Sequence, residues 1–351
     1  MKFRLIFIAI LLGIFASTKS QAQTIANTHL LLTGGESAAN YSAFSQSVIS
    51  TYPDRVPQLV ILPVLLASDA EQISIEERSE SIDILESAKV DLETACRQAL
   101  AQTADCSVQI IPVFTREDAE NPDNLKVFQS ETNGIYLLGN HAQVGWQVIA
   151  DTPIQTALNQ AYNNGIIIAG SPPGLFSHSL VQASTSGAHI DSVFDFGAIS
   201  LSAGPASQTM AMNLPKTILY NEVYQQDRLG ALLRAVNLSG EPLSGIGLDS
   251  DSAVAVSNQH LLQPVSGDTP VLILDAHTFH AAQSVRYTGA FQPTGTSNIL
   301  AHWLMPGEIT YDIKTRQLSI EAVPTRVTRN PQALRLPSGA GQLFLSADLV
   351  E

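Results

Sequence analysis

"GIIIAGSPPGLF", residues 165–176, is an aliphatic run that ends at Gly170 and passes through a serine and two prolines to Gly174. An aliphatic run bounded by glycine and proline is typical of a buried β-strand that ends in a tight turn. Many serine hydrolases present their nucleophile on a strand and turn of this kind. The two prolines therefore decide whether this turn can carry such a serine.

Four earlier runs have the same aliphatic character: "HLLLTGG" (29–35), "QLVILPVLL" (58–66), "VQIIPVF" (108–114) and "GIYLLGN" (134–140). They are apolar throughout rather than alternating, which indicates parallel strands that are covered on both faces. Helical stretches lie between them, at 36–49, roughly 70–103 and 152–163. Thr152 is expected to cap the last of these helices before Pro153.

Strands that alternate with helices predict an α/β fold with a doubly wound, mostly parallel sheet flanked by helices. Ligand sites in such sheets lie beyond the carboxyl ends of the strands. We therefore expect the loops at 33–37, 139–144 and 170–175 to share one edge of the sheet.

The second half of the chain has a different composition and a different pattern of predicted elements. A Ser/Ala/Gly-rich stretch follows residue 176, and then come a helical stretch at 221–236, strands at 245–249, 252–257 and 270–276, and a region of hairpins and extended segments at 281–351. We expect three parts: a signal peptide at 1–22, an α/β domain at 23–280, and a β-rich C-terminal extension, 281–351, packed on the same domain.

The first residues resemble a secretory signal peptide. Lys2 and Arg4 precede an apolar run from Leu5 to Ala16, and small and polar residues follow up to Ala22, where cleavage is expected. An uncleaved membrane anchor is the alternative, but no later segment reaches the roughly 20 apolar residues that a membrane span needs. The prediction is an exported protein, periplasmic or extracellular.

The chain is acidic, with a formal net charge of −14. Loss of residues 1–22 would remove three basic residues and no acid, which brings the charge to −17. An acidic surface repels nucleic acid and anionic lipid, whereas it tolerates cationic ligands.

Cys96 and Cys106 are the two cysteines of the chain. An exported chain meets an oxidising compartment, so a disulfide between the end of a helix and the next strand is expected, with two buried thiols as the alternative. Neither cysteine lies at a strand–turn–helix junction, which argues against a cysteine nucleophile and against an amidotransferase-like site.

Six segments in this order resemble the cyanophycinase and aspartyl-dipeptidase family of serine peptidases: "LLTGGES", "IYLLGNHAQ", "IIIAGSPPG", "NEVYQQDRLGALLRAV", "GIGLDSDSAVAV" and "NILAHWLMPGEITYDIKTRQL". The match covers most of the mature chain. The resemblance implies a class I glutamine amidotransferase-like, flavodoxin-like fold. It also implies hydrolysis of a peptide or of an aspartate–arginine polymer such as cyanophycin, and we expect no cofactor and no metal.

In that family the fifth strand ends in Gly-Thr-Ser-Ala-Gly, and its Ser is the nucleophile. Gly170 and Gly174 keep the two glycines, but Ser171 stands at the Thr position and Pro172 at the Ser position.

The family's base is the His of an Asp-x-His-Phe segment, where this chain has Glu222. The acid that orients the base is the Glu of Gly-Ile-Gly-Ile-Asp-Glu, where this chain has Ser250, directly after Asp249. By this register all three members of the triad are replaced.

The prolines would also change the backbone. The nucleophile of such a turn takes a strained conformation with positive φ, whereas proline fixes φ near about −65°. Pro173 also has no N–H to offer an oxyanion. The sequence therefore predicts a catalytically disabled relative.

This relative would keep a concave pocket near Gly34, Gly35, Asn140 and Gly170. Given the acidic balance of the chain, a peptide or a small cationic ligand is the expected occupant.

An active hydrolase with a rebuilt site is the alternative interpretation. Ser171 would be its nucleophile, with His141, or a histidine from the later loops (His178 or His189), as the base. Glu222 or Asp249 would orient that base.

Three further segments resemble functional motifs. "ASTSGAH" (183–189) looks like a nucleophile motif but follows no aliphatic strand. "DAHTFH" (275–280) places Asp275 and His277 on one strand face near His280, although no fourth metal ligand lies nearby, and "GLDSDSA" (247–253) lacks the closing Glu of a calcium loop. Structural roles are favoured for all three.

Overall fold

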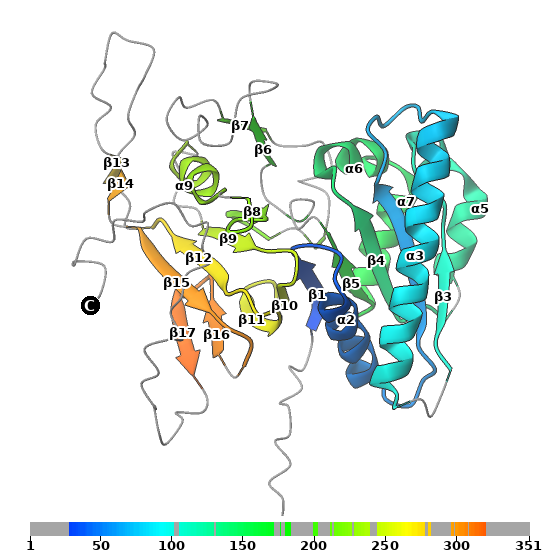
Figure 1. Cartoon of the computed structure of the whole chain (residues 1–351), viewed down its shortest axis with the longest axis horizontal. Helices are drawn as coiled ribbons and strands as arrows, with labels where there is room; N and C mark the ends of the chain where they lie inside the picture. The colour runs from blue at the N-terminus through cyan, green and yellow to red at the C-terminus, as the bar shows by residue number, and fades with distance from the viewer. Residues whose placement is uncertain are drawn as a thin grey trace, which may run out of the picture.

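A mixed sheet of nine strands is the centre of the described structure, in the order β17-β16-β11-β10-β1-β5-β4-β2-β3 (Figure 1). This computed structural model describes residues 28–101, 105–129, 131–171, 176, 180–183, 199–202, 211–212, 214–226, 228–238, 244–277, 280–281, 296–297, 299–307 and 309–320. None of the helices in these ranges combines the length and the apolar character that a bilayer span requires.

The parallel half of this sheet consists of β1 (Thr28–Thr33), β5 (Ile167–Gly170), β4 (Gly134–Gly139), β2 (Gln58–Leu65) and β3 (Ser107–Ile110). These are the five aliphatic runs of the sequence, and each pairs in parallel with its neighbour. The helices of this half are α2 (Ala38–Thr51), α3 (Ile75–Ala99), α4 (Arg116–Glu120), α5 (Pro122–Leu125), the 3-10 helix η1 (Lys126–Gln129), α6 (Ala142–Ile149) and α7 (Pro153–Asn163).

The parallel strands are covered on both faces, as their continuous apolar character predicts. Leu31 and Tyr136 point to the face that packs against α2 and α3, beside Phe44 of α2. Their chain neighbours Leu30 and Leu137 point to the other face, which packs against α6 and α7. Figure 1 shows α2 and α3 in front of these strands.

Local signals fix where the helices begin and end. The side chain of Thr152 accepts a hydrogen bond from the Gln155 N–H at the start of α7, with Pro153 in the first turn, as expected. Ser74 caps α3 in the same way, so α3 begins five residues later than the sequence suggests. The predicted disulfide between Cys96 and Cys106, with an S–S distance of 2.04 Å, connects the end of α3 to the start of β3.

The other half of the large sheet is antiparallel, so the sheet is mixed and less uniformly parallel than expected. It is formed by β10 (Ala253–Ser257), β11 (Leu261–Ser266), β16 (Ile309–Asp312) and β17 (Gln317–Ile320). The β10–β11 hairpin turns at Asn258 and Gln259, which both have positive φ, 54° and 62°. Two successive residues with positive φ give the turn a twist that matches an antiparallel pair.

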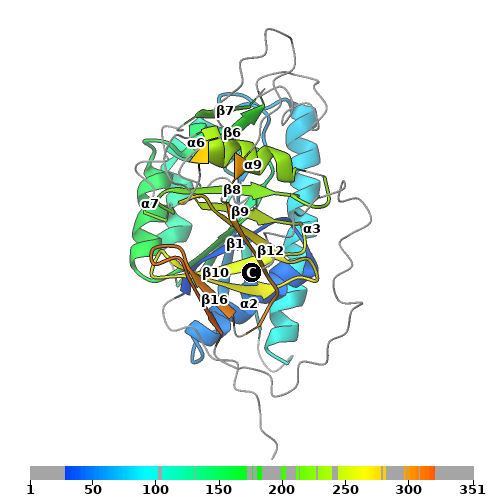
Figure 2. The same cartoon turned by 90° about the vertical axis from the view of Figure 1, so that its left-hand side faces the viewer.

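A second sheet has the order β15-β12-β9-β8 and packs against the large one. Its strands are β8 (Thr217–Asn221), β9 (Ser244–Leu248), β12 (Val271–Asp275) and β15 (Leu300–Leu304). One face of this sheet, with Ile246 and Ile273, joins the same core as Leu30. The opposite face packs under α9 (Leu229–Leu238), as Figure 2 shows with α9 beside β8 and β9.

The predicted helix at 221–236 is shorter in the structure. Residue 221 ends β8, and α9 begins only at Leu229. A turn lies between them, because Glu222 has a φ of 55° and the Asp249 carboxylate accepts hydrogen bonds from the N–H groups of Tyr224 and Gln225. The apolar pattern of this stretch therefore belongs to a strand end, a turn and a helix.

The β-rich C-terminal character is confirmed for residues up to 320, since β15 belongs to the second sheet and β16 and β17 to the large one. Two small antiparallel pairs complete the described strands: β6 (Leu180–Ala183) with β7 (Ile199–Ser202), and β13 (His280–Ala281) with β14 (Thr296–Ser297). Residues 321–351 lie outside the described residues.

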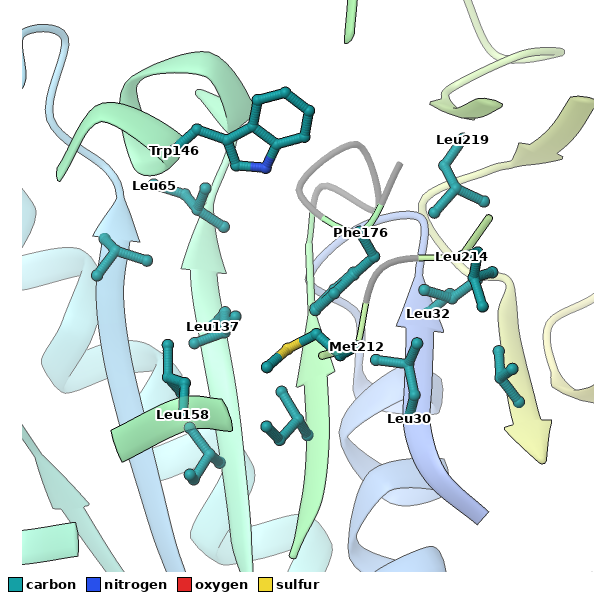
Figure 3. Close-up of a cluster of buried hydrophobic side chains, with 14 of the residues drawn as sticks. Leu30, Leu32, Leu65, Leu137, Trp146, Leu158, Phe176, Met212, Leu214 and Leu219 are labelled. Carbon is teal, nitrogen blue, oxygen red and sulfur yellow. The ribbon is translucent and has the colours of Figure 1, made fainter. Parts of the chain in front are cut away.

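The core between the two sheets and α6 contains side chains from segments that follow β5. Phe176 and Met212 are fully buried there, among Leu137 of β4, Leu32 of β1 and Trp146 of α6 (Figure 3). The chain beyond the SPPG stretch thus returns to the core directly at Phe176.

Candidate functional site

The carboxyl ends of β1, β4 and β5 meet at one edge of the large sheet, as expected. The Thr33 hydroxyl donates to the Gly170 carbonyl oxygen at 2.8 Å and shares a hydrogen bond with the Tyr136 hydroxyl at 3.1 Å. Thr33 and Tyr136 are both fully buried. The hydrogen bonds of these two side chains therefore connect β1, β4 and β5 near their carboxyl ends.

We expect the Thr33→Val variant to lower the free energy of unfolding by about 1.5 kcal/mol, because the Gly170 carbonyl and the Tyr136 hydroxyl lose a hydrogen-bond partner at a fully buried site. Urea unfolding measures this loss. The exposed Thr156→Val variant is the control and should stay within about 0.5 kcal/mol of wild type. Equal stability of wild type and Thr33→Val would contradict the hydrogen-bond network.

Gly34 and Gly35 allow the loop after β1 to touch the loop after β9. A Cβ at Gly34 would lie 2.0 Å from the Asp249 carbonyl oxygen, and a Cβ at Gly35 would lie 2.7 Å from the Ser250 Cα. The side-chain amide of Asn40 donates to the carbonyl oxygens of Gly35, at 2.8 Å, and Ser250, at 2.9 Å. The two glycines thus have a packing role, which brings the end of β9 to the candidate site.

Ser171 is the first residue after β5 and is 4% exposed. Its N–H donates to the Leu137 carbonyl oxygen at 3.1 Å, so the backbone still follows β4 at this point. Within the described part of the chain, no histidine ring hydrogen-bonds Ser171. The three residues that follow, Pro172, Pro173 and Gly174, lie outside the described residues, so the geometry of the turn stays a prediction.

Asn140 and His141 follow β4 at the same edge. The backbone N–H groups of both residues donate to the Leu65 carbonyl oxygen, each at 3.0 Å. The His141 side chain is exposed, and it does not cap α6, which begins at the next residue. His178 and His189, the other histidines considered as a base, lie outside the described residues.

Glu36 is a site residue that sequence reasoning missed. Its Oε1 accepts a hydrogen bond from the Gly139 N–H at 3.1 Å, so a carboxylate lies over the loop that follows β4. Although much of the residue is exposed, desolvation of the carboxyl group raises the pKa of Glu36, and the Gly139 hydrogen bond opposes this rise. Its place after two glycines at a strand end is the signal that could have identified it.

Glu222 and Asp249 come together at the ends of β8 and β9, which run in parallel. The Glu222 N–H donates to the Leu248 carbonyl oxygen at 2.6 Å, directly beside Asp249. The carboxylate of Glu222 pairs with Arg228 at 2.9 Å. A positive φ is unusual for a glutamate, so this ion pair and the backbone bond together hold an uncommon turn.

Asp249 is fully buried. Its Oδ1 accepts hydrogen bonds from the N–H groups of Tyr224 and Gln225, both at 3.1 Å, while its Oδ2 has no hydrogen-bond partner among the described residues. Burial raises the pKa of Asp249, and the two N–H donors oppose this shift. The side chain therefore anchors the turn after β8 and has no exposed oxygen to offer a ligand.

The raised pKa of Asp249 makes the free energy of unfolding depend on pH. Its carboxyl holds a proton more tightly in the folded chain than in the unfolded chain, where the pKa is about 3.9. The stabilisation from this proton is complete below that pH and declines as pH rises through the folded pKa.

We therefore expect Asp249→Asn to be more stable relative to wild type at pH 7 than at pH 4. Denaturant unfolding at the two pH values measures the difference. Asp249→Ala, which loses both N–H contacts, should be destabilised at both. A relative stability of Asp249→Asn that falls between pH 4 and pH 7 would show that the pKa is lowered instead.

The DAHTFH segment forms a local pair. The Asp275 Oδ1 lies 2.8 Å from the His277 Nδ1, and the guanidinium of Arg316 is 3.7 Å from the same oxygen. The His280 side chain lies outside the described residues. In the described ranges, no group of three or more His, Cys, Asp or Glu residues is placed to hold a metal ion.

The GLDSDSA segment forms a turn within the described residues. The Asp251 Oδ2 accepts hydrogen bonds from the N–H groups of Asp268, at 2.8 Å, and Thr269, at 3.2 Å. This carboxylate thus connects the loop before β10 to the loop before β12. The ASTSGAH segment lies outside the described residues apart from Ala183.

No known protein-family model matches the sequence. Among solved structures, the chain is similar to the crystal structure of a peptidase from an acI-B1 actinobacterium, with a TM-score of 0.53 and 16% identity over 82% of this chain and 99% of the other. This match shows a shared fold. A putative peptidase E protein from Listeria monocytogenes EGD-e also matches, at 12% identity over 68% of this chain and 96% of the other, with a TM-score of 0.38.

Proposed function

We propose that this chain is an exported, catalytically disabled relative of the cyanophycinase-like serine peptidases, and that it acts as a binding or regulatory protein. The peptidase-like fold supports the relationship at the level of architecture. Four of the six segments that resemble the family lie on β1, β4, β5 and β9, whose ends meet at the candidate site.

The ion pair formed by Glu222 is the observation on which this proposal rests. This residue stands where the family has its catalytic base, and its carboxylate is paired with Arg228 at 2.9 Å. A base must be free to reach the proton of its nucleophile. A carboxylate that is held by a neighbouring guanidinium is not free in this way.

The position of the orienting acid is also occupied by a residue that cannot play the family's catalytic role. Ser250 holds the family's acid position, and its N–H and C=O groups bond to Gln225 and Asn40. Asp249 beside it is fully buried and binds backbone N–H groups. The polar groups of the triad region thus maintain the backbone, and this supports a scaffold that binds without cleaving.

The proposed ligand is a peptide or a small cationic molecule. The mature chain would carry a net charge of −17 after loss of residues 1–22, which attracts cations and repels anionic polymers. Glu36 supplies a carboxylate at the candidate site itself.

A fluorophosphonate probe tests the proposal, because it labels an activated serine covalently. We expect no labelling of the purified protein and no turnover of cyanophycin or β-aspartyl dipeptides. Stoichiometric labelling that Ser171→Ala abolishes and Ser250→Ala preserves would overturn the proposal. Together with turnover, that result would establish the rebuilt hydrolase, with Ser171 as its nucleophile.

A further inference from the structure

A cavity lies along α7, outside the loops of the candidate site. Its volume is about 740 Å³, within the range of about 300–1,000 Å³ that is common for ligand pockets. Ile135 and Ile166, at the starts of β4 and β5, line it, whereas the candidate site follows the other ends of these strands. We call this cavity the α7 groove, because one stripe of α7 and its flanks forms a wall.

That wall carries a row of polar side chains. Thr156, Gln160 and Asn164 line the groove and are exposed. Their side chains form no hydrogen bond with any described residue. They lie one helical turn apart, about 6 Å, while an extended peptide presents groups on the same side about every 6.7 Å. The row therefore offers donors and acceptors at nearly the spacing of an extended backbone.

Most of the other residues that line the groove are apolar, although Thr132 and Thr152 are also among them. Leu125 and Phe128 line it from α5 and η1, opposite α7. Ala157 and Ala161 lie on the α7 wall, where small side chains leave room for a guest. An apolar floor beside a polar row matches a strand-like peptide, which has side chains on one side and amides along its edge.

One end of the groove is negatively charged. Asp151 lines it, is exposed, has a φ of 57°, and forms no ion pair within the described residues. No Lys or Arg among the described residues lines the groove; Arg116, which lines the neighbouring cavity with Asp151, pairs with Glu120 at 3.2 Å. Charge complementarity therefore favours a basic group at this end, in a chain that is acidic as a whole.

We propose that the α7 groove binds an extended peptide of about five residues, with a Lys or Arg next to Asp151. The 11 residues of α7 span about 16 Å, the length of about five extended residues. The site is separate from the proposed function, since none of its residues belongs to the loops around Gly34, Gly139 or Ser171.

Nuclear magnetic resonance with ¹⁵N-labelled protein tests this site. The probes are two pools of acetylated and amidated pentapeptides, mixed from Ala, Val, Leu and Thr, with a single Lys at one end or the other. Two matching pools carry Glu instead. We expect the Lys pools to shift the side-chain amide signals of Gln160 and Asn164 at millimolar concentration, and the Glu pools to shift them less.

Variants separate the groove from the rest of α7. Gln160→Ala with Asn164→Ala should weaken binding of the Lys pool about tenfold, because two hydrogen bonds are lost. Asn163→Ala is the matched control on the same helix: Asn163 is exposed but does not line the groove, so its change should leave binding within about twofold. Asp151→Asn should remove the preference for Lys over Glu, since asparagine tolerates the positive φ without the charge.

Three results would overturn the proposal. They are no shift with any pool, equal binding of the Lys and Glu pools to wild type, and unchanged binding by the double variant. None of these results bears on fluorophosphonate labelling at Ser171, so the two proposals fail separately.

Discussion

Replacement of Gly34 by alanine is expected to lower the free energy of unfolding by about 3 kcal/mol, which is the upper part of the range for overpacked sites. The new Cβ would lie 2.0 Å from the Asp249 carbonyl oxygen and 2.6 Å from its carbonyl carbon. Both are backbone atoms, so no flexible side chain can move aside. The loop after β1 and the loop after β9 would have to separate.

Chemical denaturation of Gly34→Ala and of a control, Gly307→Ala, measures this effect. A Cβ at Gly307 would meet no atom within 4 Å, although its φ of 154° disfavours alanine. The control should therefore lose only about 1 kcal/mol of backbone strain. If Gly34→Ala loses no more stability than Gly307→Ala, the close approach of the two loops is wrong.

Loss of the Cys96–Cys106 disulfide is the second large effect that we expect, at about 3 kcal/mol. The crosslink closes a short loop with a sequence separation of 10, and it restricts the unfolded chain. Cys96→Ala with Cys106→Ala is the suitable variant, because both residues are buried and a serine hydroxyl would lack partners there. Urea unfolding without reductant should reveal the loss.

The same experiment with reductant is the internal control. Reduced wild type should approach the stability of the double variant, because both then lack the crosslink. Unchanged stability of wild type whose thiols are shown to be fully reduced would contradict a stabilising role for this bond.

The parallel half of the fold could be predicted from sequence because each strand there is buried on both faces. Five aliphatic runs give the five strands, and Thr152 and Pro153 mark the start of α7. The antiparallel half carries weaker signals. Pro264 lies within β11, where a proline argues against a strand, and the β10–β11 turn uses Asn258 and Gln259 without a glycine.

The site was predictable to the extent that it follows strand ends. Gly34, Gly170 and Asn140 could be placed at one edge from the glycine-terminated runs alone. The side chains that connect this edge could not, because Thr33 and Tyr136 are 103 residues apart, and only the packed sheet brings them together. The ion pair of Glu222 with Arg228 and its positive φ could not be predicted from the sequence either. Both depend on the turn that Asp249 anchors.

Asn40 has a consequence for any spectroscopic study of this protein. Both protons of its amide are used, on Gly35 at 2.8 Å and Ser250 at 2.9 Å, and its oxygen accepts from Ser266 at 2.8 Å. A rotation of this amide by half a turn would place oxygen against two carbonyls, so it has a single orientation. Each of its two amide proton resonances therefore reports on one of the two loops, and a movement of either loop should shift the corresponding resonance.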